Sequence, residues 1–301
     1  MNRRSMCWVG LLLAAFPGAW AAEPDSLEAK LRGMTAGFPG TVSLYARNLD
    51  TGREVAIDAD RRVRTASTIK LPIACALAAE VDAKRARWDE RLVIRRQDKV
   101  SGSGVLTDFS DDETISLRDA LTMMIIVSDN TATNLILDRI SADRVNEFMR
   151  SLELNHTRSM RKIRGDGTQL KPAEGWSRDG EKPENKRFGI GASTSREMVR
   201  LLEMLEQGKV VSPTTSKAML AVLERQQYKD GIGRYSGDLR VASKSGSLDA
   251  LRSDVGIVYT PQGRIAIAIT VDDMPNIDYS PDNIGLKLIG DLSKVLITEL
   301  R

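Results

Sequence analysis

The spacing of hydrophobic and polar residues predicts that strands from both ends of the chain enclose a long helical region. The segment "SLEAKLRGMTAG" from residue 26 has apolar residues three or four positions apart, which is typical of an amphipathic helix. Residues 41–57 alternate around an Asp-Thr-Gly turn and predict a β-hairpin. From residue 66 to about 160 the periodicity is helical, with helices expected at 67–80, 116–128, 131–140 and 142–152.

The second half of the chain predicts the rest of the sheet. Residues 161–187 are rich in charged residues, Gly and Pro, so we expect a long surface loop there. Further elements follow: helices at 195–207 and 213–226, strands at 239–248, 252–260 and 264–272, and a last helix at about 281–300. The pattern therefore predicts an α+β fold in three α/β/α layers, with a five-stranded antiparallel sheet flanked by terminal helices. Residues 22–62 and 192–301 would form this part, and residues 63–191 an inserted all-α subdomain.

The first residues have the pattern of a secretory signal peptide. Basic residues at 3–4 precede the apolar stretch "CWVGLLLAAF", and Ala19-Trp20-Ala21 fits a cleavage site between small residues. The alternative is a membrane anchor, but the apolar run is too short to span a bilayer and Pro17 interrupts it. We therefore expect residues 1–21 to be removed, and the protein to be exported to the periplasm or secreted without a stable membrane anchor.

Composition limits the possible partners. The 301 residues are 42% hydrophobic, which is enough for one large domain or two modest ones. Loss of Arg3 and Arg4 with the signal peptide lowers the formal charge from +3 to +1. This balance gives no electrostatic basis for binding nucleic acid or an anionic membrane. Cys75 would be the only remaining cysteine, so no intramolecular disulfide is possible. We also expect the protein to be a monomer.

The histidine content excludes several kinds of hydrolase. His156 is the only histidine, whereas zinc hydrolases normally need two or three. A Ser-His-Asp triad would have to use His156, and the chain contains no G-x-S-x-G motif. We therefore expect no metal and no other cofactor, and a general base other than histidine.

Ser67 and Lys70 stand at the start of the helix predicted at 67–80, in "TASTIKLPIACAL". Serine is a common N-cap, and this spacing alone favours capping, since a second Ser-x-x-Lys occurs at Ser159 and Lys162 in a polar stretch. Three positions apart, however, the side chains of Ser67 and Lys70 share one helix face. Apolar surroundings would lower the pKa of the lysine, and the neutral amine would then serve as base for a serine nucleophile.

Two further motifs add to this pair. Ser-Asp-Asn at 128–130 lies between two predicted helices, where these residue types are also common caps. Lys-Ser-Gly at 244–246 lies within a predicted strand, where Lys and Gly are both unfavourable. A ligand whose backbone lies along the strand would explain both residue types.

In this order the three motifs resemble those of the class A β-lactamase family, and the layout of the whole mature chain is similar to that family. The resemblance implies that Ser67 is the acylated nucleophile and Lys70 its proton partner. It also implies that Ser128 passes a proton to the leaving nitrogen, that Asp129 braces the turn, and that Lys244 supplies positive potential.

The same resemblance implies the substrate-binding residues. Asn130 would bind the side-chain amide of the substrate, and Ser245, next to Gly246, its carboxylate. The backbone N–H groups of Ser67 and Ser247 would form the oxyanion hole, worth roughly 3 kcal/mol per donor in comparable sites.

The family also uses an arginine near the carboxylate, for which Arg252 and Arg234 are candidates. Ser101 and Ser103 fall where the family lines the mouth of the site.

One expected element is missing. The family carries a Glu-x-x-Leu-Asn element, and its glutamate activates the deacylating water. It should fall near 162–166, where this chain reads "KIRGD". Asp166 is the nearest candidate base, with Glu174 on the same loop, and the alternative is that both are solvated loop charges. Without a placed base, hydrolysis of the acyl-enzyme would be slower by something like 10²–10⁴-fold.

We therefore expect an exported serine acyl hydrolase that opens β-lactam rings through Ser67. One alternative is a peptidoglycan DD-peptidase, a penicillin-binding protein that acts on stem peptides and deacylates slowly. Another is a non-catalytic β-lactam or peptidoglycan sensor. The sequence argues against the sensor, because we expect neither a second domain nor a membrane anchor to carry a signal.

Overall fold

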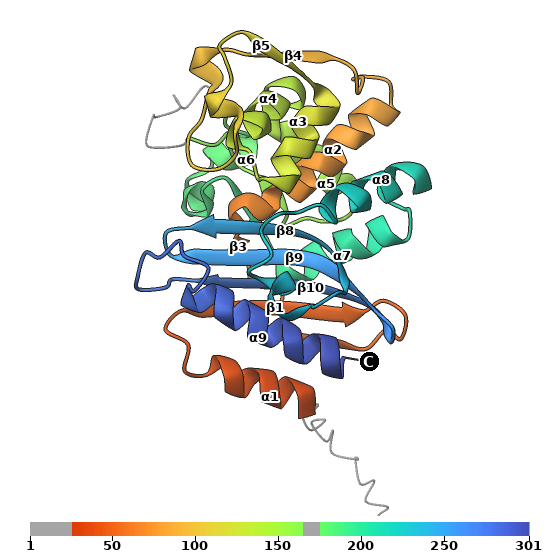
Figure 1. Ribbon diagram of the computed structural model, residues 1–301, viewed down its shortest axis with the longest axis vertical. Coiled ribbons are helices and arrows are strands. Elements are labelled where there is room, and N and C mark those ends of the chain that lie inside the picture. Colours follow the sequence, from red (N-terminus) through yellow and green to blue (C-terminus); the bar gives the residue numbers. More distant parts are fainter. Residues whose placement is uncertain (1–25, 165–174, 301) are drawn as a thin grey trace, which may run out of the picture.

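A five-stranded antiparallel sheet lies at the centre of the computed structural model, which describes residues 26–164 and 175–300 (Figure 1). In spatial order its strands are β2 (Glu54–Ile57), β1 (Thr41–Asn48), β10 (Gly263–Asp272), β9 (Leu251–Thr260) and β8 (Arg240–Leu248). β1 pairs with β10 along its whole length, so the two ends of the chain meet within the sheet. The predicted sheet is confirmed.

The residue pattern of β10 explains why helices cover both faces. The odd-numbered residues 265–271 are Ile or Val, and they share an apolar cluster with α1 (Ser26–Thr35) and α9 (Ile284–Glu299). Ala266 and Ala268 belong to the cluster on the other face, together with residues of α7 (Ser195–Glu206). Because side chains alternate along a strand, bulky residues meet the terminal helices and small ones allow α7 close to the sheet. The α/β/α layers are confirmed.

A group of helices lies on the side of the sheet away from α1 and α9 (Figure 1). It comprises α2 (Lys70–Asp82), α3 (Leu117–Ile126), α4 (Asn130–Ile140) and α5 (Ala142–Ser151), while α8 (Pro213–Leu223) packs against α7, β8 and α3. The chain enters and leaves this group through a small sheet of β3 (Val63–Arg64), β7 (Gly191–Ser193) and β6 (Arg158–Ser159). The division into subdomains at residues 63 and 191 stays a prediction.

Two local predictions are wrong. The region expected to be wholly helical contains a strand pair, β4 (Arg91–Ile94) with β5 (Glu113–Ser116). The expected loop at 161–187 contains α6 (Arg178–Glu181) and a 3₁₀-helix, η4 (Pro183–Phe188). Phe188, the last residue of η4, anchors this segment, because it packs with Met160 and Ala192 in a small buried cluster of its own.

Some predictions fall on residues that the structure does not describe. The predicted signal peptide at residues 1–21 is one of them, and so are Asp166 and Glu174. Within residues 26–164 and 175–300, no helix is long and apolar enough to cross a membrane.

Candidate active site

Ser67 lies in a 3₁₀-helix, η1 (Ala66–Ile69), directly before α2. The α-helix therefore begins at Lys70, later than predicted, and Ile69 occupies its N-cap position without a side-chain cap. The Ser67 hydroxyl caps nothing, and within the described chain it makes no hydrogen bond. Ala66 has a φ of +46°, a rare conformation for a residue with a side chain and one that is often found at functional sites.

Lys70 is fully buried beneath this turn. Its Nζ donates to the carbonyl oxygen of Ser128 at 2.6 Å, to Ser128 Oγ at 3.1 Å and to Asn130 Oδ1 at 2.9 Å. The expected contact with the Ser67 hydroxyl is not formed, and the amine is held by these three groups instead. Burial, and then the nearby charge of Lys244, hold the pKa of Lys70 well below its usual value.

Lys244 approaches the same serine from β8. Its Nζ donates to Ser128 Oγ at 3.0 Å and to the carbonyl oxygen of Ser245 at 2.6 Å. Burial lowers the pKa of Lys244 to about 7, which Asp254 on the neighbouring strand partly opposes. Ser128 Oγ thus lies between two buried amines that both lose protons easily.

The Ser128 turn is held in place by the loop at 101–106. Asp129 Oδ2 accepts hydrogen bonds from the N–H groups of Val105 and Leu106, at 2.7 and 2.9 Å. Asn130 Nδ2 donates to the carbonyl oxygen of Ser101 at 2.9 Å, and its backbone N–H donates to that of Ser103, also at 2.9 Å. Asp129 therefore braces the turn, and the two serines position Asn130 through their backbones.

Gly246 is required where β8 meets η1. A Cβ at Gly246 would lie 2.9 Å from the backbone nitrogen of Ser67 and 2.9 Å from the carbonyl oxygen of Thr65. Real Cβ atoms essentially never approach this closely. Contact between two backbones thus accounts for this glycine without any ligand.

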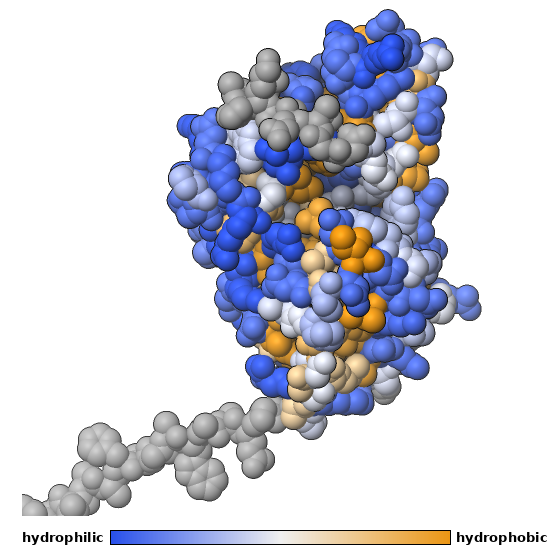
Figure 2. All heavy atoms as spheres, turned by 90° about the vertical axis from the view of Figure 1, so that its left-hand side faces the viewer, coloured by the Kyte–Doolittle hydropathy of each residue, from blue (hydrophilic) through white to orange (hydrophobic). Residues whose placement is uncertain are grey.

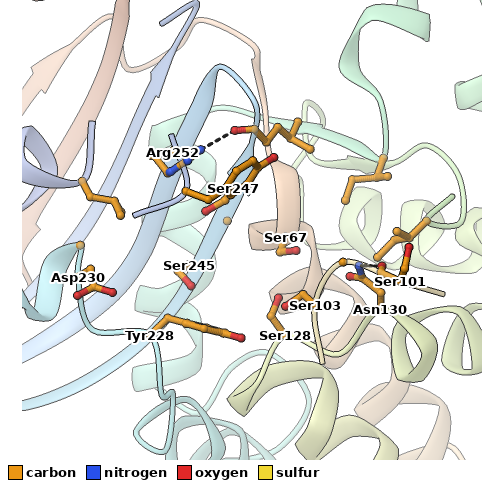
Figure 3. A pocket seen from close by; sticks show the side chains of 18 of the residues that line it. Ser67, Ser101, Ser103, Ser128, Asn130, Tyr228, Asp230, Ser245, Ser247 and Arg252 are labelled. Atoms are coloured by element: carbon orange, nitrogen blue, oxygen red, sulfur yellow. Dashed lines mark hydrogen bonds between the residues drawn. The ribbon is translucent and has the colours of Figure 1, made fainter. Parts of the chain in front are cut away.

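These elements surround a cavity of about 810 Å³. In Figure 3, Ser67 lies between Ser245, Ser247 and Arg252 on one side and Ser101, Ser103 and Asn130 on the other. Figure 2 views the molecule from the side toward which β8 runs in Figure 1; hydrophilic residues cover most of this face, and apolar residues gather near its middle. Sequence reasoning missed several of the lining residues: Arg161, Ile163, Arg164, Ile190, Tyr228, Asp230, Tyr279, Pro281 and Leu286.

The two candidate arginines differ in position. Arg252 lines the cavity, is paired with Ser247 across the β8–β9 ladder, and lies 4.8 Å from the centre of the Tyr279 ring. Arg234 does not line it; its guanidinium donates to the carbonyl oxygen of Pro281 and forms an ion pair with Asp282. The structure therefore brings only Arg252 to the other site residues.

Comparison with known proteins agrees with this arrangement. The sequence model of a protein family, described as the beta-lactamase enzyme family, matches residues 26–300. The chain belongs to this family. The protein is therefore a serine β-lactamase-like hydrolase.

Several relatives cover most of the chain. Beta-lactamase 1 of Streptomyces cacaoi is 26% identical over 269 residues, or 82% of this chain and 76% of that protein. A beta-lactamase structure from Sphaerobacter thermophilus is 31% identical, with a TM-score of 0.77, over 90% of this chain and 95% of that one. A mutant of PBP-A, solved as an acyl-enzyme complex with penicillin G, is 26% identical with a TM-score of 0.75, over 90% and 95% of the two chains.

Ile163 lies within residues 162–166, the range in which the resemblance leads us to expect the family's glutamate. Its N–H donates to Asn134 Oδ1 at 2.8 Å, and Asn134 Nδ2 donates to its carbonyl oxygen at 2.9 Å. Asn134 is buried on α4, one turn after Asn130 and on the same helix face. A polar residue at this position was the signal in the sequence for a contact with the loop, and sequence reasoning missed it. Among the described residues that line the cavity, Asp230 is the only acidic one.

The substitution Lys244→Met tests, through the pH dependence of stability, whether burial lowers the pKa of Lys244. The folded protein holds the pKa of Lys244 at about 7, below the ordinary 10.4 or so, so the unfolded chain binds more protons between these values. This residue should therefore make the unfolding free energy rise with pH, by up to about 1.4 kcal/mol per pH unit. Urea unfolding between pH 7.5 and 9.5 should show that steeper rise in wild type than in Lys244→Met. A control at the exposed Lys217 should keep the wild-type slope, and equal slopes for wild type and Lys244→Met would contradict the account.

Proposed function

We propose that the protein hydrolyses β-lactams through an acyl-enzyme on Ser67. The observation that carries this proposal is a serine hydroxyl without a hydrogen-bond partner in the described chain, facing a cavity beside two buried lysines that share Ser128. A nucleophile needs a nearby group that takes its proton, and a buried amine with a lowered pKa supplies one. The proposed enzyme is of class A and acts in the periplasm after removal of a signal peptide.

Acylation then proceeds in two proton transfers. The Ser67 oxygen attacks the carbonyl carbon of the lactam as its proton passes to the neutral amine of Lys70. The backbone N–H groups of Ser67 and Ser247 bind the resulting oxyanion. When the C–N bond breaks, the ring nitrogen takes a proton from Ser128, and Lys70 returns one to Ser128. Hydrogen bonds of 3.1 and 3.0 Å from Lys70 and Lys244 to Ser128 Oγ support this route.

The substrate carboxylate would bind at the end of β8. Ser245 and Arg252 line that part of the cavity, and Lys244 lies beneath it. A carboxylate arriving there favours the charged form of Lys244, so binding would raise the pKa of its amine again. Asn130 Nδ2 has two hydrogens and gives one to Ser101, which leaves the other for an acyl side-chain carbonyl.

A second function, a DD-peptidase that deacylates slowly, is favoured by Ile163. An isoleucine side chain cannot activate water, and its backbone is fixed at the cavity by Asn134. The PBP-A structures among the similar proteins are compatible with this alternative. Acylation is the same in both functions, and they differ in how fast water releases the acyl group.

A chromogenic cephalosporin, followed together with intact mass, tests the first step. Continuous colour release indicates a β-lactamase, whereas one equivalent of release with a persistent adduct indicates the peptidase. Ser67→Ala should abolish the adduct and lower turnover by about 10³-fold or more, because the nucleophile is lost. Ser159→Ala, at the other Ser-x-x-Lys, should retain both. A folded wild-type protein that shows neither turnover nor adduct would overturn the proposal.

Ile163→Glu tests the assignment of the deacylation position. A carboxylate on this fixed backbone would act as general base for water, so we expect release of a penicillin G adduct to be at least about tenfold faster. Ile163→Gln is the matched control, since it has the same length and polarity without a base. Decay of the adduct by intact mass gives both rates, and equal rates for Glu and Gln would show that this position does not reach the attacking water.

A further inference from the structure

Arg161 brings a positive charge to the lining of the same cavity. It lines the cavity together with Arg164, and both guanidinium groups lie over Trp176, at 5.6 and 5.5 Å from the ring centre. Its backbone forms an antiparallel bridge with that of Trp176. The indole face and the backbone bridge hold Arg161 in position.

No carboxylate of the described chain pairs with Arg161. Within the described chain, its guanidinium makes one hydrogen bond, from Nη1 to the carbonyl oxygen of Lys162 at 2.9 Å. The neighbouring Lys162, by contrast, forms an ion pair with Asp138 at 2.7 Å. Burial and the charge of Arg164 lower the pKa of Arg161 to about 10, which reflects the cost of a cation without a counter-charge. An anion from a ligand would remove that cost.

The position of Arg161 indicates which part of a ligand it meets. The segment at 161–164 is fixed to α4 by Asn134, one turn beyond Asn130. Figure 3 shows Asn130 and Arg252 on opposite sides of Ser67. If the carboxylate of a β-lactam lies at Arg252 and its side-chain amide at Asn130, the acyl substituent extends toward Arg161.

We propose that Arg161 is a specificity-determining residue for substrates whose acyl side chain carries a carboxylate. This inference rests on the proposed function for the orientation of the ligand. A planar guanidinium with most of its donors unused suits a carboxylate, which it can bind through two parallel hydrogen bonds. Substrates would then be dianions, held by Arg252 at one end and Arg161 at the other.

Carbenicillin and benzylpenicillin form a matched pair of probes, since they differ by one carboxylate on the acyl side chain. Their dissociation constants are measured by calorimetry in the Ser67→Ala background, where no acylation follows binding. We expect Arg161→Gln to weaken carbenicillin binding about tenfold and benzylpenicillin binding less than twofold, and Arg161→Lys to restore part of the difference. Lys186→Gln is the control, because Lys186 lies 3.6 Å from the centre of the same Trp176 ring but does not line the cavity.

Three results would overturn the subsite. They are carbenicillin binding no tighter than benzylpenicillin, equal loss of both ligands in Arg161→Gln, and the same loss in Lys186→Gln. Failure of the proposed function is recognised separately, as absence of a Ser67 adduct in the unsubstituted protein with either penicillin. If carbenicillin binds more tightly than benzylpenicillin but no Ser67 adduct forms, the carboxylate subsite at Arg161 is supported and the proposed hydrolase function is rejected.

Discussion

The site depends on the contact between two backbones, where β8 lies against the 3₁₀-turn that carries Ser67. Gly246 has no side chain at the point where a Cβ would lie 2.9 Å from the Ser67 nitrogen. The contact joins the sheet to the start of the helical region, and the cavity lies beside it. Ala66, with φ of +46°, belongs to the same turn and directly precedes Ser67.

Two buried lysines give this junction its chemistry. Lys70 comes from the helix after the turn and Lys244 from the strand against it, and both reach Ser128 Oγ. Burial lowers the pKa of both lysines, and the nearby charge of Lys244 lowers the pKa of Lys70 further. A buried charge without a counter-charge would normally destabilise a protein, and loss of a proton removes that cost. The neutral amine that results is the base that we propose for Ser67.

The fold was largely predictable, because alternation in the strands and a 3.6-residue period in the helices are set by burial of one face. The grouping of the three motifs was predictable from their order, although each alone resembles a helix cap or a solvated strand. Three features were not. Gly246 pointed to a ligand, whereas its neighbour is the Ser67 backbone. The position of Asn134 one turn after Asn130 did not show that it holds Ile163, and Arg161 belonged to an apparent loop. Each depends on contacts between segments far apart in the sequence.

The most direct measurement of the central claim is the acylation rate of Gly246→Ala with a chromogenic cephalosporin, alongside its urea unfolding. A methyl group at Gly246 must push β8 and the Ser67 turn apart, so we expect acylation to be slower by about tenfold or more and stability to fall by about 1–3 kcal/mol. Gly33→Ala, where an added Cβ meets nothing within 4 Å, should acylate like wild type. Acylation of Gly246→Ala at the wild-type rate would contradict the account.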